Sequence, residues 1–97
     1  MYKVAINHEI RDLVPLYLQH RHDNLSSLKQ LLLTPDFEAI QNIGDRMHGS
    51  GALYGFVKIT DIGRSLEYAA KVGDKDRIKQ GVEALENFLQ DLDICFV

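Results

Sequence analysis

Apolar residues recur every three or four positions along most of the chain, a spacing typical of amphipathic helices. Four segments show this pattern, beginning with residues 9–33, where Pro15 either kinks one helix or marks the first turn of a new helix after Asp12. The second covers residues 37–54 and the third residues 60–72. The fourth has the most regular apolar stripe: Ile78, Val82, Leu85, Leu89, Leu92 and Phe96. No segment shows a convincing strand alternation.

Helix-breaking and capping residues separate these segments. Pro35 follows the first segment, and either Thr34 or Asp36 can cap the second. Gly55 is a reasonable helix stop, and Gly73 suits a C-cap before the next helix. Because the resulting connections are short, the pattern predicts an all-α fold, an antiparallel four-helix bundle, as a single domain over residues 1–97.

The composition narrows the class of protein. The 97 residues carry 45% apolar side chains and a net charge of -3, which argues against nucleic acid or an anionic membrane surface as the main partner. No apolar run approaches the roughly 20 residues of a membrane span. Cys95 is the only cysteine, so we expect a small core residue and a reducing, cytoplasmic location. The spacing of histidines and carboxylates predicts no metal site, and no cofactor motif is present.

The stretch "IGDRMHGSGALYGF", residues 43–56, contains four glycines within a helical pattern. Each glycine inside a helix costs about 1 kcal/mol relative to alanine. On a helical wheel Gly44 and Gly51 fall on the apolar side, where we expect them to let neighbouring helices approach closely. Gly49 points outward, so its lack of a side chain clears space on the surface.

Asp45 stands on the same outward side, about 140° from Ile40 on the wheel. Its neighbours at one-turn spacing are small or polar, namely Gln41, His48, Gly49 and Ala52. A bare strip beside a charged side chain predicts that another macromolecule docks there. Its candidate contacts are Gln41, Arg46, Gly49, Ser50 and Ala52. Arg46 either adds positive charge at the rim of this strip or is a solvated surface residue.

The stretch "IGDRMHGSGALYGFVKITDIGRSLEYAAKVGD" resembles the signature of histidine-containing phosphotransfer (HPt) domains. In that family the second helix carries a histidine and, three residues later, a lysine followed by glycine and serine, which Gly49 and Ser50 match. The Leu-Glu pair of the third helix is matched by Leu66 and Glu67. The resemblance covers nearly the whole chain. It implies an HPt-like bundle whose partners are receiver domains of response regulators, histidine kinases, or both.

The chain departs from the family at the key position, because Asp45 stands where the phosphoacceptor histidine belongs and His48 stands in place of the lysine. A carboxylate brings negative charge toward the phosphoryl group and would form a labile mixed anhydride. We therefore expect a protein that docks partners without transferring phosphate and has no independent catalytic activity. We also expect it to be a monomer. Whether Asp45 is natural or engineered stays open.

Two alternatives remain. In the first, the alignment to the family motif is shifted so that His48 is the phosphoacceptor of an active phosphotransfer protein. This shift takes Gly49 and Ser50 out of the positions of the family's glycine and serine. In the other, the bundle is a plain scaffold without a receiver partner. His48 itself either substitutes for the family's lysine when protonated or is bonded to Asp45 or Gln41.

Glu67 is expected to have a structural role. Arg64 and Lys71 lie about one turn away from it and are its candidate partners.

Overall fold

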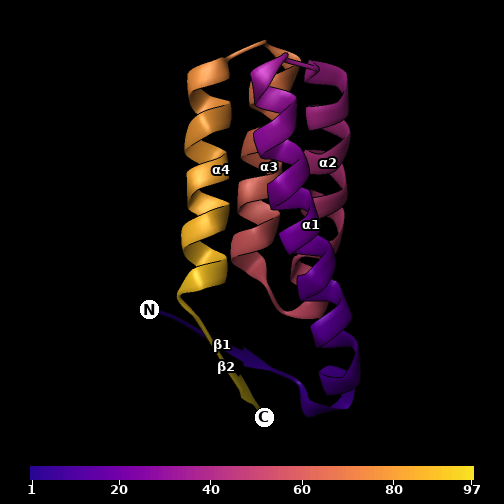
Figure 1. Cartoon of the computed structure of the whole chain (residues 1–97). Helices are drawn as coiled ribbons and strands as arrows, with labels where there is room; N and C mark the ends of the chain where they lie inside the picture. The colour runs from indigo at the N-terminus through magenta and orange to yellow at the C-terminus, as the bar shows by residue number, and fades with distance from the viewer.

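The computed structural model describes residues 1–97, and four antiparallel helices form its body (Figure 1). They are α1 (Val14–Leu33), α2 (Phe37–Ser50), α3 (Val57–Lys71) and α4 (Lys75–Gln90). The helices lie side by side, and the whole chain measures 40 × 22 × 18 Å. The predicted all-α four-helix bundle is confirmed. Every helix lacks the continuous apolar stretch that crossing a bilayer requires.

The helix ends follow from the capping residues in the sequence. The Asp36 carboxylate accepts a hydrogen bond from the Ala39 backbone N–H at 3.1 Å and caps α2. Asp74 caps α4 in the same way through the N–H of Arg77, also at 3.1 Å. Gly73, with a φ of 71°, adopts the left-handed conformation in the turn between α3 and α4.

Pro15 marks the start of a new helix, which resolves the two alternatives that the sequence left open. Residues His8–Leu13 form a 3-10 helix (η1), and α1 begins at Val14 with Pro15 in its first turn. Proline is tolerated there because the first N–H groups of a helix have no partner within the helix. The expected continuous segment over residues 9–33 is therefore two elements.

The second predicted segment also ends early. α2 stops at Ser50, and a short 3-10 helix, η2 (Ala52–Tyr54), leads to Gly55 and then to α3. The buried hydroxyl of Thr60 stabilises this break, because it donates to the His48 carbonyl at 3.2 Å and accepts from the Ala52 N–H at 2.7 Å. The exit of the chain from α2 is thus fixed by a side chain of α3.

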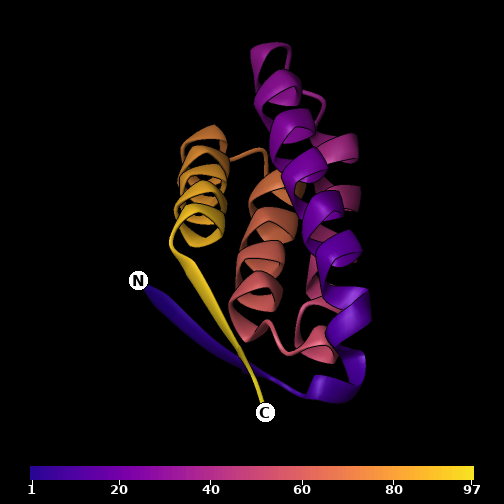
Figure 2. The same cartoon turned by 60° about the horizontal axis from the view of Figure 1, so that its bottom comes forward.

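Two short strands at the chain ends were not predicted. β1 (Tyr2–Ile6) and β2 (Leu92–Phe96) form a parallel pair, with Tyr2 opposite Leu92 and Ile6 opposite Phe96. Figure 2 shows this ribbon at the open end of the bundle, between the end of α4 and the start of α1. The expectation of a strand-free chain, with helical periodicity through Phe96, is wrong.

Cys95 is exposed, so its predicted place in the core is also wrong. The reason is that successive side chains of β2 point to opposite sides of the strand. Ile94 turns partly toward the bundle, and its neighbour Cys95 therefore faces solvent.

The core lies between the four helices, and α2 and α3 make its closest approach. A Cβ atom added at Gly44 would lie 2.8 Å from the Gly63 carbonyl oxygen, and one added at Gly51 would lie 2.7 Å from the Phe56 carbonyl oxygen. The predicted packing role of Gly44 and Gly51 is confirmed. Gly63, the α3 partner of this contact, was not identified from the sequence.

Candidate functional site

Asp45 lies exposed on the outer face of α2, as the helical wheel predicts. None of the ion pairs in the chain involves its carboxylate. A Cβ atom added at Gly49, one turn further on, would meet no atom within 4 Å. The carboxylate therefore stands beside open space, and a partner surface can approach it closely.

Gln41 and Ala52 extend this region along α2 in both directions. Gln41 is half-buried, and Ala52 is exposed at the start of η2. We call Gln41, Asp45, Gly49 and Ala52 the outer strip. All four were predicted from the sequence to share one face, and no bulky side chain is among them.

His48 lies at the edge of the outer strip that faces α3. Its Nδ1 atom is 3.4 Å from Oε1 of Glu67, and 36% of the His48 side chain is exposed. The expected partners of His48, Asp45 or Gln41, are wrong, as are Arg64 and Lys71 for Glu67. The cause is the close contact of α2 with Gly63, which brings the next turn of α3, with Glu67, beside His48.

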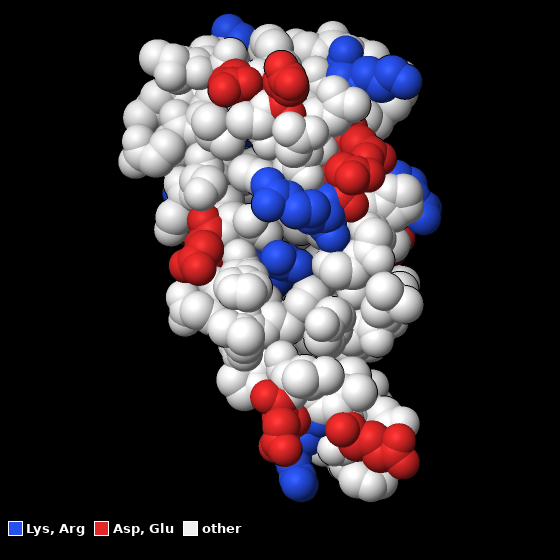
Figure 3. Space-filling view, turned by 90° about the vertical axis from the view of Figure 1, so that its right-hand side faces the viewer, with Lys and Arg blue, Asp and Glu red and all other residues white.

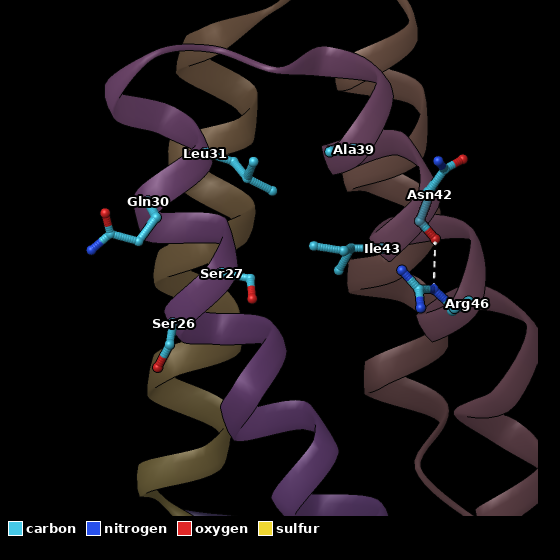
Figure 4. A pocket seen from close by; sticks show the side chains of 8 residues that line it. All are labelled: Ser26, Ser27, Gln30, Leu31, Ala39, Asn42, Ile43 and Arg46. Atoms are coloured by element: carbon cyan, nitrogen blue, oxygen red, sulfur yellow. Dashed lines mark hydrogen bonds between the residues drawn. The ribbon is translucent and has the colours of Figure 1, made fainter.

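Arg46 lies at the opposite edge of the outer strip, the edge that faces α1. Its Nε atom donates to the Asn42 carbonyl oxygen at 3.4 Å, and its guanidinium group extends into the gap between the two helices (Figure 4). This gap is a groove of about 530 Å³. The groove is lined by Ser26, Ser27, Gln30, Leu31, Ala39, Asn42, Ile43 and Arg46.

Ser50 faces α1 rather than the outer strip. Its Oγ atom accepts a hydrogen bond from Nη1 of Arg21 at 3.1 Å and lies 3.0 Å from the Tyr17 hydroxyl. The predicted contact of Ser50 with a partner is therefore less direct than that of Gly49. Its observed contacts connect the end of α2 to α1.

Arg21 is a residue that the sequence reasoning missed. It is 8% exposed, although arginine is seldom buried, and it occupies an inward position of α1. A signal exists in the sequence, because Arg21 stands midway between Tyr17 and Leu25 in the apolar spacing of that helix. A charged residue inside an apolar stripe indicates a buried polar contact.

Charge is distributed unevenly over the α1–α2 face. Figure 3 shows basic side chains in the hollow at the middle of this face, with acidic side chains around it. The described chain contains no group of three His, Cys, Asp or Glu residues that could hold a metal ion.

The four-helix bundle and the open space at Gly49 on the exposed face of α2 agree with the HPt resemblance found in the sequence. The chain matches the Hpt domain family model over residues 12–94 and belongs to that family. Membership supports a role in two-component phosphorelay signalling, in which Hpt domains interact with receiver domains and kinases. No match is found among curated proteins or among solved structures.

Proposed function

We propose that this Hpt domain docks receiver or histidine kinase domains through the outer strip and does not relay phosphate through Asp45. The observation that carries the proposal is the exposed, unpaired carboxylate at the position that the family resemblance gives to the phosphoacceptor histidine. Open space at Gly49 supports the docking part, since a receiver must bring its active site close to that position.

The chemistry of Asp45 supports the loss of transfer. A phosphoacceptor in this pathway attacks the phosphorus of an aspartyl phosphate with a lone pair, and the receiver carboxylate leaves. A carboxylate acceptor would exchange one mixed anhydride for another and would place two like charges together in the approach. The imidazole of a histidine has neither disadvantage.

Docking is tested by Gly49→Leu, which fills the open space without entering the core. We expect at least tenfold weaker binding to a cognate receiver domain in calorimetric titration, with a thermal midpoint that is not lowered. Asn87→Leu is the matched control, because Asn87 is exposed on α4 and away from the outer strip. Equal affinities of the two variants would show that the outer strip is not the docking surface.

A second candidate function is phosphotransfer through His48, and one contact favours it. When Nδ1 of His48 donates its proton to Glu67, the lone pair of Nε2 is free to accept a phosphoryl group. Nε2 would then attack the phosphorus while the bond to the receiver carboxylate breaks. Against this candidate, His48 points to the α3 edge and not along the outer strip.

This candidate is tested by incubating the unmodified chain with a phosphorylated receiver. Transfer through His48 requires a label that is stable in base, labile in acid, and absent from His48→Gln. An unlabelled chain that still binds the receiver rules out His48 as the acceptor. A chain that neither binds nor accepts label from any receiver encoded in the same genome would be a scaffold.

A further inference from the structure

The ribbon of β1 and β2 has an outer edge on each strand that carries unpaired backbone groups. Within the ribbon, the Tyr2 N–H donates to the Asp91 carbonyl oxygen at 2.9 Å, and the Val97 N–H donates to the Ile6 carbonyl oxygen at 2.8 Å. In a parallel pair of strands, only every second residue directs its N–H and C=O groups toward the neighbouring strand. The residues between these direct theirs outward, and the sheet has no third strand to receive them.

The outer edge of β1 lies against the bundle. The Ala5 carbonyl oxygen belongs to this edge, and a Cβ atom added at Gly55 would lie 4.0 Å from it. The same Cβ atom would lie 2.6 Å from Cδ1 of Ile6. Lys3, also on β1, is exposed, and lysine is a residue with which proteins discourage pairing at a sheet edge. A further strand therefore has little access to β1.

The outer edge of β2 carries the outward backbone groups of Leu92, Ile94 and Phe96. No backbone hydrogen bond joins these three residues to another part of the chain outside the ribbon. The side chains of Leu92 and Ile94 pack against the core, and Phe96 is 40% exposed. β2 contains no lysine or proline, and Asp93 is its only charged residue. An unprotected edge of this kind is a template for another strand.

We propose that the outer edge of β2 pairs with β2 of a second copy of this chain, in an antiparallel arrangement centred on Ile94. Two-fold symmetry then places Ile94 opposite itself and Leu92 opposite Phe96 of the other copy. These are the residues whose backbone groups point outward, so each opposing pair can exchange hydrogen bonds. The proposal does not rest on the proposed function, because β2 contains no residue of the outer strip.

Charge and symmetry favour a second copy as the occupant. The pairing places Asp93 opposite Cys95 of the other copy, so that no two like charges lie directly across from each other. Because the outer edge of β1 is covered, the assembly closes at two copies and does not grow further. The inference departs from the monomer expected from the sequence, which did not predict the strands.

The test compares the unmodified chain at concentrations of about 10 µM and about 1 mM, under reducing conditions because Cys95 is exposed. Sedimentation velocity should show a reversible equilibrium of monomer and dimer. At the higher concentration the amide protons of Leu92, Ile94 and Phe96 should exchange with solvent at least tenfold more slowly in NMR spectra. The Lys3 amide, on the outer edge of β1, should exchange rapidly at both concentrations.

Two results would overturn the proposal. The first is a chain that sediments as a monomer throughout, or that associates without slowing the exchange of the β2 amides. The second is slower exchange that appears only when a receiver domain is added, because the edge would then belong to a different partner.

The register is tested by charge at Cys95. Cys95→Lys should tighten the dimer about three- to tenfold at low salt, because each lysine lies opposite Asp93 of the other copy, and Cys95→Glu should weaken it by a similar factor. Gln80→Lys and Gln80→Glu are matched controls for net charge, since Gln80 is exposed on α4. Equal effects at the two positions would contradict the proposed pairing.

The backbone contribution is tested at Phe96. Phe96→Pro removes an N–H from the outer edge, while the bonds of Val97 to β1 remain. Phe96→Ala is the matched control, because it removes the ring and keeps the N–H. We expect the dissociation constant of the dimer to be at least tenfold larger for Phe96→Pro than for Phe96→Ala. Equal constants would show that backbone pairing at β2 does not hold the two copies together.

Discussion

At the scale of single residues, the glycines of α2 have opposite environments within less than two turns of helix. A Cβ atom at Gly44 would lie 2.7 Å from the Glu67 backbone nitrogen, whereas one at Gly49 would meet nothing within 4 Å. The first glycine is required by packing. The second lowers helix propensity without a packing gain, which is consistent with a surface kept clear for a partner.

These environments predict opposite effects of the same substitution. Gly44→Ala should lower the free energy of unfolding by about 1–3 kcal/mol, because the α3 backbone must move away. Gly49→Ala should raise it by about 0.5–1 kcal/mol, since the helix gains propensity and loses no contact. Urea denaturation of both variants measures the difference. Destabilisation by Gly49→Ala would contradict the open space at that position.

The sequence predicted the direction of a side chain more reliably than its partner. Asp45 and Gly49 could be placed outward from periodicity alone, because rotation about a helix axis depends only on spacing. The contacts of His48 with Glu67 and of Arg21 with Ser50 join two helices. Such contacts depend on the distance between packed helices. Here Gly63 sets that distance for α2 and α3, because it has no side chain to separate them.

At the scale of elements, the helices were predictable and the strands were not. Each helix satisfies its hydrogen bonds locally, and α2 and α4 also carry side-chain caps, Asp36 and Asp74. β1 and β2 are five residues each and pair across the full length of the chain. In addition, Leu92 and Phe96 are four residues apart, a spacing that fits both a helix stripe and alternate positions of a strand.

The terminal ribbon contributes to the core through Ile6, which is 1% exposed. Ile6→Ala should lower the free energy of unfolding by about 2–5 kcal/mol, because it leaves a cavity where the ribbon closes the bundle. Lys3→Ala, at an exposed position of the same strand, should change it by less than about 0.5 kcal/mol. Chemical denaturation with similar values for both variants would mean that the ribbon does not pack on the bundle.

At the scale of the whole molecule, the proposed docking surface is the outer face of α2, whereas the inner face of the same helix packs in the core. The outer strip lies on α2, His48 and Glu67 form its α3 edge, and Arg46 forms its α1 edge. Membership of the Hpt domain family connects this arrangement to phosphorelay signalling. The family resemblance, and not the helical periodicity, pointed to this function, because a four-helix bundle serves many functions.

The most direct test of the central claim is phosphoryl transfer from a labelled receiver to variants at position 45. Asp45→His should acquire a base-stable, acid-labile label, because it restores an imidazole on the open face of α2. The unmodified chain and Asp45→Asn, the matched control without a nucleophilic imidazole, should stay unlabelled while binding the receiver. The assignment of Asp45 to the phosphoacceptor position would be contradicted by label on the unmodified chain. It would also be contradicted if the Asp45→His variant bound the receiver and stayed unlabelled.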